Sequence, residues 1–280
     1  MCYVWQKYLE EIRRDALFLT DTILVRMIIT KHFLEFTLDK TDIVTAIVVF
    51  AAIWIGIGFT AVNVFKDQPK RLSWSISLVN SFVLTVVGIV YLVVKVPTFD
   101  NFLFFGDNGR EVFHSLDNVS VLVSIWFTLA NISDLVFGLI FYRKFLDPLT
   151  AYVHHFVYIW ILVTGMTGHG GFATFEPYCA GPVYMFVEEM PTFMLALGSV
   201  FPSCRTDIGF GVTFLLLRLL YHGYMLLYSV YLGANLVVPV MFTLTMALHV
   251  FWYYVWCTKY GWKLLWPDSR AMKKPVDKLA

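Results

Sequence analysis

Long apolar runs separated by short polar connections dominate the chain from residue 41 to residue 257. A bilayer core of about 30 Å requires about 20 apolar residues per helix. Breakers and charges punctuate the connections, as in KDQPKR at 66–71, GDNGRE at 106–111 and FPSCRTD at 201–207. The pattern predicts an all-α polytopic membrane helical bundle with about seven transmembrane helices, at Ile43–Phe65, Trp74–Val94, Val119–Tyr142, Ala151–Gly168, Pro177–Phe201, Ile208–Gly233 and Asn235–Cys257.

The N-terminal segment, residues 1–40, follows a different pattern. Trp5, Leu9 and Ile12 recur at helical spacing, while Lys7 and Arg13 occupy other faces. This is typical of an amphipathic helix that lies in the membrane interface or packs on the bundle. A short helix outside the membrane, with no role in lipid binding, is the open alternative.

Composition supports a membrane location. Hydrophobic residues make up 59% of the 280 residues, charged residues 15%, and the mean hydropathy is +0.69. Soluble domains have about a quarter of their residues charged, so this chain has too few to cover a water-facing surface. The net charge of +1 argues against a nucleic-acid partner. The four cysteines are scattered and show neither a zinc motif nor a disulfide framework.

The distribution of lysine and arginine predicts the orientation of the bundle. Connections that would lie on one side hold Lys70, Arg71, Arg143 and Lys144, and the C-terminal tail at 263–280 adds more. Cytosolic loops of membrane proteins carry such an excess. We therefore expect the C-terminus in the cytosol and the N-terminus in the lumen or outside the cell. The endoplasmic reticulum is the favoured membrane, and the plasma membrane is the alternative.

Eight ionisable residues fall within the predicted spans, where burial in lipid is costly unless they face the bundle interior. Depths counted along each span place all of them between the cytosolic surface and the bilayer midplane. This clustering predicts a polar chamber that is open toward the cytosol. The residues are Asp134, His154, His155, Glu188, Glu189, Arg218, His222 and His249.

Arg218 is expected to anchor this chamber. A guanidinium stays charged in proteins and therefore needs an anion, and Glu188 or Glu189 lies at matching depth. Pro191 removes one helical hydrogen bond and predicts a kink beside these glutamates. A purely structural ion pair explains the same pattern, since each buried charge needs the other.

The histidines have equally plain explanations. His222 and His249 could be satisfied by backbone carbonyls or tyrosine hydroxyls, and His154 and His155 stand near the interface, where polar residues are ordinary. A metal centre would need three or four converging ligands, which the spacing does not indicate. No metal and no cofactor are expected from the sequence.

Several ordered motifs resemble the TLC domain family, which includes ceramide synthases and non-synthase branches. They are RLSWSISLVNSFV, NISDLVFGLI around Asp134, YVHHFVYIWIL with the paired histidines, FVEEMPTFMLAL with the glutamates, and MALHVFWYYVW. Their order and spacing carry the resemblance across residues 71–262. It implies six core helices around a lipid-accessible cavity, preceded here by one extra span and its loop at 41–70.

The chain departs from the synthase pattern at one point. Ceramide synthases place His-Asp and, three residues later, Asp on the helix that follows the paired histidines. Glu188, Glu189 and Thr192 stand at those positions here, and this difference resembles the non-synthase branches. The resemblance implies that the eight ionisable residues and Thr192 line the lipid cavity.

The favoured function is sensing or regulation of membrane lipid composition or fluidity, with membrane lipids as partners and no catalysis asserted. One alternative is an acyltransferase that uses His154 and His155 on an acyl-CoA. The other is a lipid transporter or cargo receptor.

Overall fold

The computed structural model describes residues 37–95, 116–146, 148–168, 180–231 and 236–261. Over these ranges the chain is 92% helical and contains no strand. The predicted amphipathic helix before residue 37, the GDNGRE connection and the C-terminal tail lie outside the described residues. The prediction of an all-α membrane bundle is confirmed at this level.

Nine α-helices and six short irregular turns make up the described residues. The helices are α4 (Lys40–Phe65), α5 (Pro69–Lys95), α8 (Asn118–Phe141), α9 (His154–Thr167), α10 (Ala180–Met185), α11 (Glu189–Val200), α12 (Asp207–Thr213), α13 (His222–Tyr231) and α14 (Val237–Trp256). The 3₁₀ turns are η1 (Arg143–Phe145), η3 (Phe186–Glu188) and η4 (Pro202–Cys204), and the π turns are η2 (Pro148–Val153), η5 (Phe214–Tyr221) and η6 (Cys257–Gly261).

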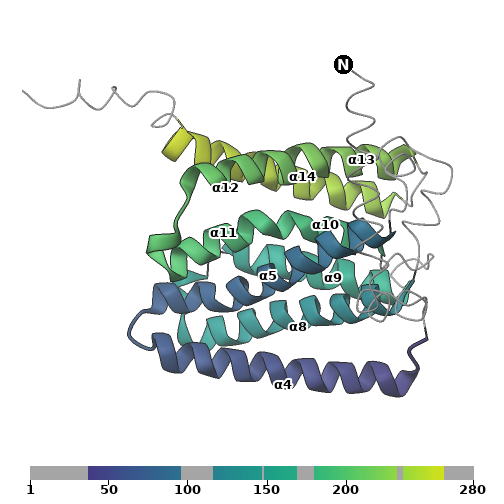
Figure 1. Cartoon of the computed structure of the whole chain (residues 1–280), viewed down its shortest axis with the longest axis horizontal. Coiled ribbons are helices and arrows are strands. Elements are labelled where there is room, and N and C mark those ends of the chain that lie inside the picture. The colour runs from purple at the N-terminus through teal and green to yellow at the C-terminus, as the bar shows by residue number, and fades with distance from the viewer. Residues whose placement is uncertain (1–36, 96–115, 147, 169–179, 232–235, 262–280) are drawn as a thin grey trace, which may run out of the picture.

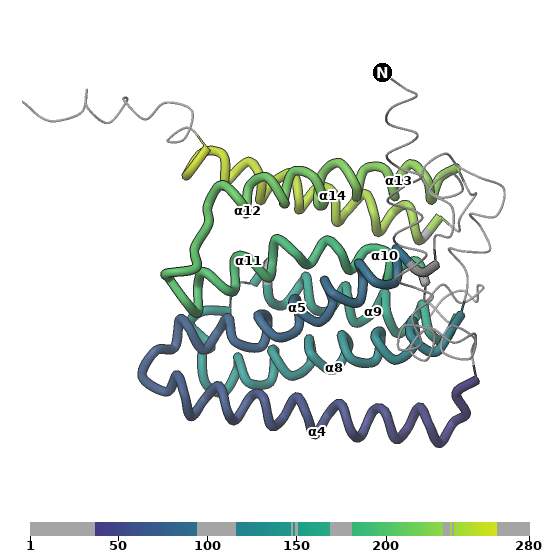
Figure 2. Tube along the Cα trace, viewed as in Figure 1, coloured from purple at the N-terminus to yellow at the C-terminus, as the bar shows by residue number. Residues whose placement is uncertain are grey.

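The helices lie roughly parallel in one bundle (Figure 1). Helix α4 forms one edge and packs on α8 and α5, while α12, α13 and α14 form the opposite edge. Between them α5 packs against α11, and α8 packs against α9. The Cα trace shows that the α4–α5 connection, the α11–α12 connection and the end of α14 all lie at the same end of the bundle (Figure 2).

Five helical segments are long and apolar enough to cross a membrane, judged by length and composition. Large apolar side chains project from their outer surface, including Val48 and Phe59 of α4 and Leu227 of α13, each more than half exposed. Such a surface suits lipid rather than water. The five segments are Lys40–Phe65, Pro69–Val93, Asn118–Phe141, Asp207–Tyr231 and Val238–Gly261.

The remaining two predicted spans coincide with interrupted helices. The fourth is divided between the π turn η2 and α9, and the fifth between α10, the 3₁₀ turn η3 and α11. Their continuous α-helical parts are 14, 6 and 12 residues long. One of the five long segments, Asp207–Tyr231, is divided in the same way by the π turn η5, so an interruption does not by itself exclude a span. Both segments nevertheless run alongside the longer helices (Figure 1).

Side-chain capping sets the starts of helices α4 and α8, at the end of the bundle opposite the α4–α5 and α11–α12 connections. Asp39 and Asp42 form a reciprocal capping box at the start of α4, and Asp117 and Ser120 form another at the start of α8. Gly58 lets the ring of Phe137 approach the α4 backbone, because a Cβ at that position would overlap the ring. Helices α4 and α8 therefore pack closely, and α8 presents its other face to the bundle interior.

Candidate polar site in the bundle interior

Irregular helical turns position the polar residues of the interior. His154 is the first residue after the π turn η2, Glu188 ends the 3₁₀ turn η3, and Arg218 lies within the π turn η5. Such turns change the direction of side chains and of backbone carbonyls, and π turns are frequent at functional sites. Beside the glutamates, where the sequence predicts a kink, the 3₁₀ turn η3 interrupts the helix directly before Glu189.

Arg218 is buried at the centre of the site. Its Nε donates to the backbone carbonyl of Glu188 at 2.9 Å, and its Nη2 donates to Glu189 Oε1 at 3.0 Å and to Thr192 Oγ1 at 2.6 Å. The predicted pairing of Arg218 with a glutamate inside the bundle is confirmed, and Glu189 supplies the carboxylate. Charge-assisted hydrogen bonds of this kind offset the cost of burying the guanidinium.

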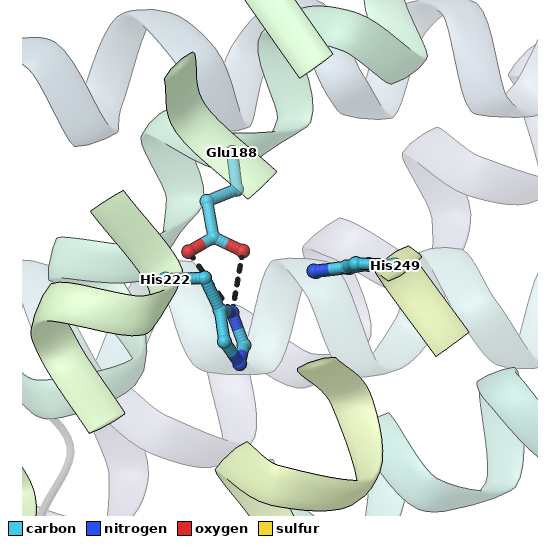
Figure 3. Close-up of side chains that lie close together, drawn as sticks. All are labelled: Glu188, His222 and His249. Carbon is cyan, nitrogen blue, oxygen red and sulfur yellow. Dashed lines mark hydrogen bonds and ion pairs between the residues drawn. The ribbon is translucent and has the colours of Figure 1, made fainter. Parts of the chain in front are cut away.

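Glu188 turns its carboxylate to His222 (Figure 3). Its two oxygens lie 3.1 and 3.0 Å from His222 Nδ1, and His222 Nε2 lies 2.9 Å from the carbonyl oxygen of Phe242. His249 Nδ1 lies 3.0 Å from the carbonyl oxygen of Arg218, which a π turn leaves accessible to a side chain. Each of these two histidines therefore contacts a backbone carbonyl, as one interpretation of the sequence expected.

Asp134 forms a second polar group on the other side of the interior. Tyr142 donates its hydroxyl to Asp134 Oδ1 at 2.5 Å, and His155 Nε2 lies 3.6 Å from Asp134 Oδ2. His155 Nδ1 is buried without a hydrogen-bond partner among the described residues. His154 packs its ring against Tyr158 and Trp252 instead, with centroid distances of 4.6 and 5.8 Å.

Sequence reasoning did not single out Tyr142. It lies eight residues beyond Asp134, a separation that does not indicate contact along a regular helix. Tyr142 is the C-cap of α8 and leaves the helical conformation, with φ −139° and ψ 34°. That change of direction brings its hydroxyl to Asp134.

A cavity of about 510 Å³ joins the two polar groups. Its lining also includes apolar side chains such as Phe127, Phe214 and Trp252. Six of the nine predicted cavity residues line it, namely Asp134, His154, His155, Glu189, Thr192 and Arg218. Glu188, Glu189 and His222 border an adjoining cavity of about 80 Å³, and fully buried His249 borders neither of these two cavities.

Basic side chains stand at the mouth of the larger cavity. Lys70 in the first turn of α5, Arg205 beyond η4 and Lys259 of η6 all line it and are exposed. Arg205 donates to Asp207 Oδ1 at 2.9 Å and to the Tyr260 hydroxyl at 3.0 Å. Partial burial lowers the pKa of Arg205, but these two contacts outweigh it and raise the pKa above its usual value. The mouth therefore carries fixed positive charge.

Comparisons with protein families, with curated proteins and with solved structures found no match for this chain. The resemblance to the TLC domain family stays a prediction based on the ordered motifs.

Proposed function

We propose that this chain senses or regulates the lipid composition of its membrane by binding a lipid head group in the larger cavity. The observation that carries the proposal is the cavity itself, a space of about 510 Å³ that is lined by polar and apolar side chains and lies between helices long and apolar enough to cross a membrane. A soluble ligand would not need an entrance surrounded by lipid-facing apolar surface, whereas an amphipathic ligand suits both environments.

The charge at the mouth favours an anionic head group. Lys70, Arg205 and Lys259 line the entrance, where Asp207 pairs with Arg205, and the three cations outnumber this carboxylate. Arg218 lies deeper inside and is paired with Glu189. A phosphate at the entrance would gain the attraction of these cations without stranding a buried charge. The apolar lining beyond them, including Phe210 and Phe214, would accept the start of the acyl chains.

Neutralising the mouth should weaken binding of an anionic lipid. Lys70→Gln combined with Lys259→Gln is expected to lower affinity for phosphatidic acid about thirtyfold, because each cation contributes about 1 kcal/mol near a charged lipid. Retention of phosphatidic acid by the purified chain in phosphatidylcholine nanodiscs, followed by native mass spectrometry, measures this.

The matched control is Lys66→Gln combined with Lys144→Gln. These two lysines are exposed, lie outside the cavity lining, and their loss changes the net charge by the same amount. Equal weakening by both pairs would mean that lipid is attracted by overall charge, and the cavity would lose its proposed role.

The proposed architecture has seven spans, with α9 and the α10–α11 segment completing the five long helices. The position of α4 at the edge of the bundle supports its role as a span added to a six-helix core of TLC type. The gathering of the α4–α5 connection, η4 and η6 at one end supports a cytosolic mouth and a cytosolic C-terminus.

Tags at the two termini test this orientation by protease protection in sealed microsomes. We expect digestion of the C-terminal tag and protection of the N-terminal one. Digestion of both would contradict the seven-span topology.

One observation favours an acyltransferase as the second candidate. Asp134 lies beside His155 Nε2, while Nδ1 of the same ring is buried without a described partner. A carboxylate that orients a histidine is a common arrangement for a general base. Ceramide formed from acyl-CoA and a sphingoid base by membranes containing the chain, and lost on Asp134→Asn, would favour this candidate. We expect no such activity, because Glu188, Glu189 and Thr192 occupy the synthase positions.

A further inference from the structure

We propose that Glu188, His222 and His249 form a zinc-binding site inside the bundle. One ligand atom of each residue lies within 4.8 Å of those of the other two. The residues come from η3, α13 and α14, and all three are buried. His249 points its ring toward Glu188 and His222 (Figure 3). No sequence motif indicates this convergence, because 27 to 34 residues separate successive ligands.

Backbone carbonyls fix the tautomers of both histidines. A carbonyl oxygen only accepts, so His222 Nε2 must carry the proton that it donates to Phe242, and His249 Nδ1 must carry the proton donated to Arg218. The neutral forms of the rings then have lone pairs on His222 Nδ1 and on His249 Nε2. Metal-binding histidines are held in the same way, with the other ring nitrogen donating to a carbonyl or carboxylate.

These lone pairs and the Glu188 carboxylate face one another. His222 Nδ1 lies 3.0 and 3.1 Å from the two carboxylate oxygens, a contact between acceptors that needs a positive species. A proton shared between Glu188 and His222 would satisfy that pair alone. A divalent metal would satisfy the pair and would also use the third lone pair, on His249, whose ring centroid lies 4.9 Å from that of His222.

Arg218 does not prevent His249 Nε2 from binding a metal. Its Nη1 lies 3.4 Å from His249 Nε2, which is long for a hydrogen bond. The guanidinium already donates to the Glu188 carbonyl, to Glu189 and to Thr192. It can therefore lose the contact with His249 without losing its counter-ion.

The site needs a small contraction to hold the metal. Zinc ligands at about 2.0–2.2 Å from the ion in tetrahedral geometry are about 3.4 Å apart, so the widest pair must approach by roughly 1.4 Å. Small side-chain rotations of Glu188 and His249 supply such a movement. The cavity of about 80 Å³ beside Glu188 and His222 has room for a water molecule as the fourth ligand.

The ligand set selects the class of metal. Two imidazoles and one carboxylate with an open fourth position suit zinc, and the same set also binds iron(II), whereas calcium and magnesium prefer oxygen ligands. Glu189 neutralises Arg218, so Glu188 leaves one excess positive charge on a divalent ion. A hydroxide or another anion at the fourth position would remove that excess in the low-dielectric interior.

Metal analysis of the full-length chain tests the site. The chain is purified in nanodiscs with a tag free of histidine, equilibrated with buffered zinc, and analysed by mass spectrometry for elements. We expect about one zinc per chain, and at least about 100-fold weaker binding in Glu188→Gln, His222→Gln and His249→Gln, since even outer-shell changes cost 10- to 100-fold. His155→Gln is the control, because it removes a partly buried histidine outside the site and retains every cysteine.

Two results would overturn the proposal. Folded wild-type protein with less than about 0.1 zinc per chain would leave the shared proton as the explanation. Zinc binding that is unchanged in the three variants, or lost equally in His155→Gln, would place the metal elsewhere. Should the variants fail to fold, cobalt added to the wild type decides: intense visible absorption of four-coordinate cobalt, displaced by zinc, is expected, and its absence contradicts the site.

Discussion

Arg218→Leu is expected to lower the free energy of unfolding by about 3–5 kcal/mol, because it strands the Glu189 carboxylate in a buried site. It also removes the donors to the Glu188 carbonyl and to Thr192. The loss should appear as a lower folded yield in detergent and a lower melting temperature in matched nanodiscs.

Arg205→Leu is the control for this substitution. Arg205 also forms an ion pair at 2.9 Å, with Asp207, but its side chain is 44% exposed and solvent screens the interaction. Exposed pairs contribute about 0–1 kcal/mol, so this variant should unfold nearly as the wild type does. If Arg218→Leu melted no earlier than Arg205→Leu, the interior would have to be solvated rather than dry.

Gly88→Val should be the next most damaging change. A Cβ on Gly88 of α5 would lie 2.6 Å from the backbone nitrogen of Val187 and 2.9 Å from the backbone carbon of Phe186. Backbone atoms cannot rotate away, so α5 and η3 must separate and carry Glu188 from His222. Overpacking of this kind costs about 1–3 kcal/mol, which a lower melting temperature would report.

Gly56→Val provides the comparison on α4. A Cβ at Gly56 would meet nothing within 4 Å, so the same substitution should be tolerated there. Equal melting temperatures for the two variants would mean that α5 does not pack on η3 as described.

The sequence predicted the helical bundle because the bilayer constrains span length and composition. Five of its seven apolar runs coincide with long helices. The remaining two are interrupted at Pro148–Val153 and Phe186–Glu188, and the long segment Asp207–Tyr231 is interrupted at Phe214–Tyr221. Hydropathy does not distinguish a broken helix from a continuous one. Pro191 did signal the second interruption, because a proline inside a helix removes a hydrogen bond. The π turn around Arg218 had no comparable marker.

The depth of charged residues predicted part of the site. A buried arginine requires an anion, and this requirement predicts from the sequence alone that Arg218 pairs with one of the glutamates. Which glutamate would bind Arg218 depended on η3, whose turn directs Glu189 to Arg218 and Glu188 to His222. The hydrogen bond between Tyr142 and Asp134 was also not predicted, because it forms only where the chain leaves the helical conformation at the end of α8.

The position of the three cations at the mouth of the larger cavity could not be predicted from the sequence. In the sequence, Lys70 was informative only as a marker of orientation, and nothing there linked it to Arg205 or Lys259. They lie far apart in the chain, and their common role depends on packing that brings the starts of α5 and α12 and the end of α14 to one end of the bundle. Helix packing therefore creates the proposed anion entrance, and no local pattern encodes it.

Lipid profiling of cells tests the proposed function most directly. Expression of the full-length chain should change the acyl composition of phospholipids, and His154→Ala combined with His155→Ala should abolish that change at an equal protein level. Both histidines line the larger cavity, so their loss removes polarity from it while the mouth cations remain. Ceramide formation that depends on the histidines would contradict this function and favour the acyltransferase. Phospholipid and ceramide profiles that both remain unchanged would contradict it too, and would favour a lipid transporter or cargo receptor.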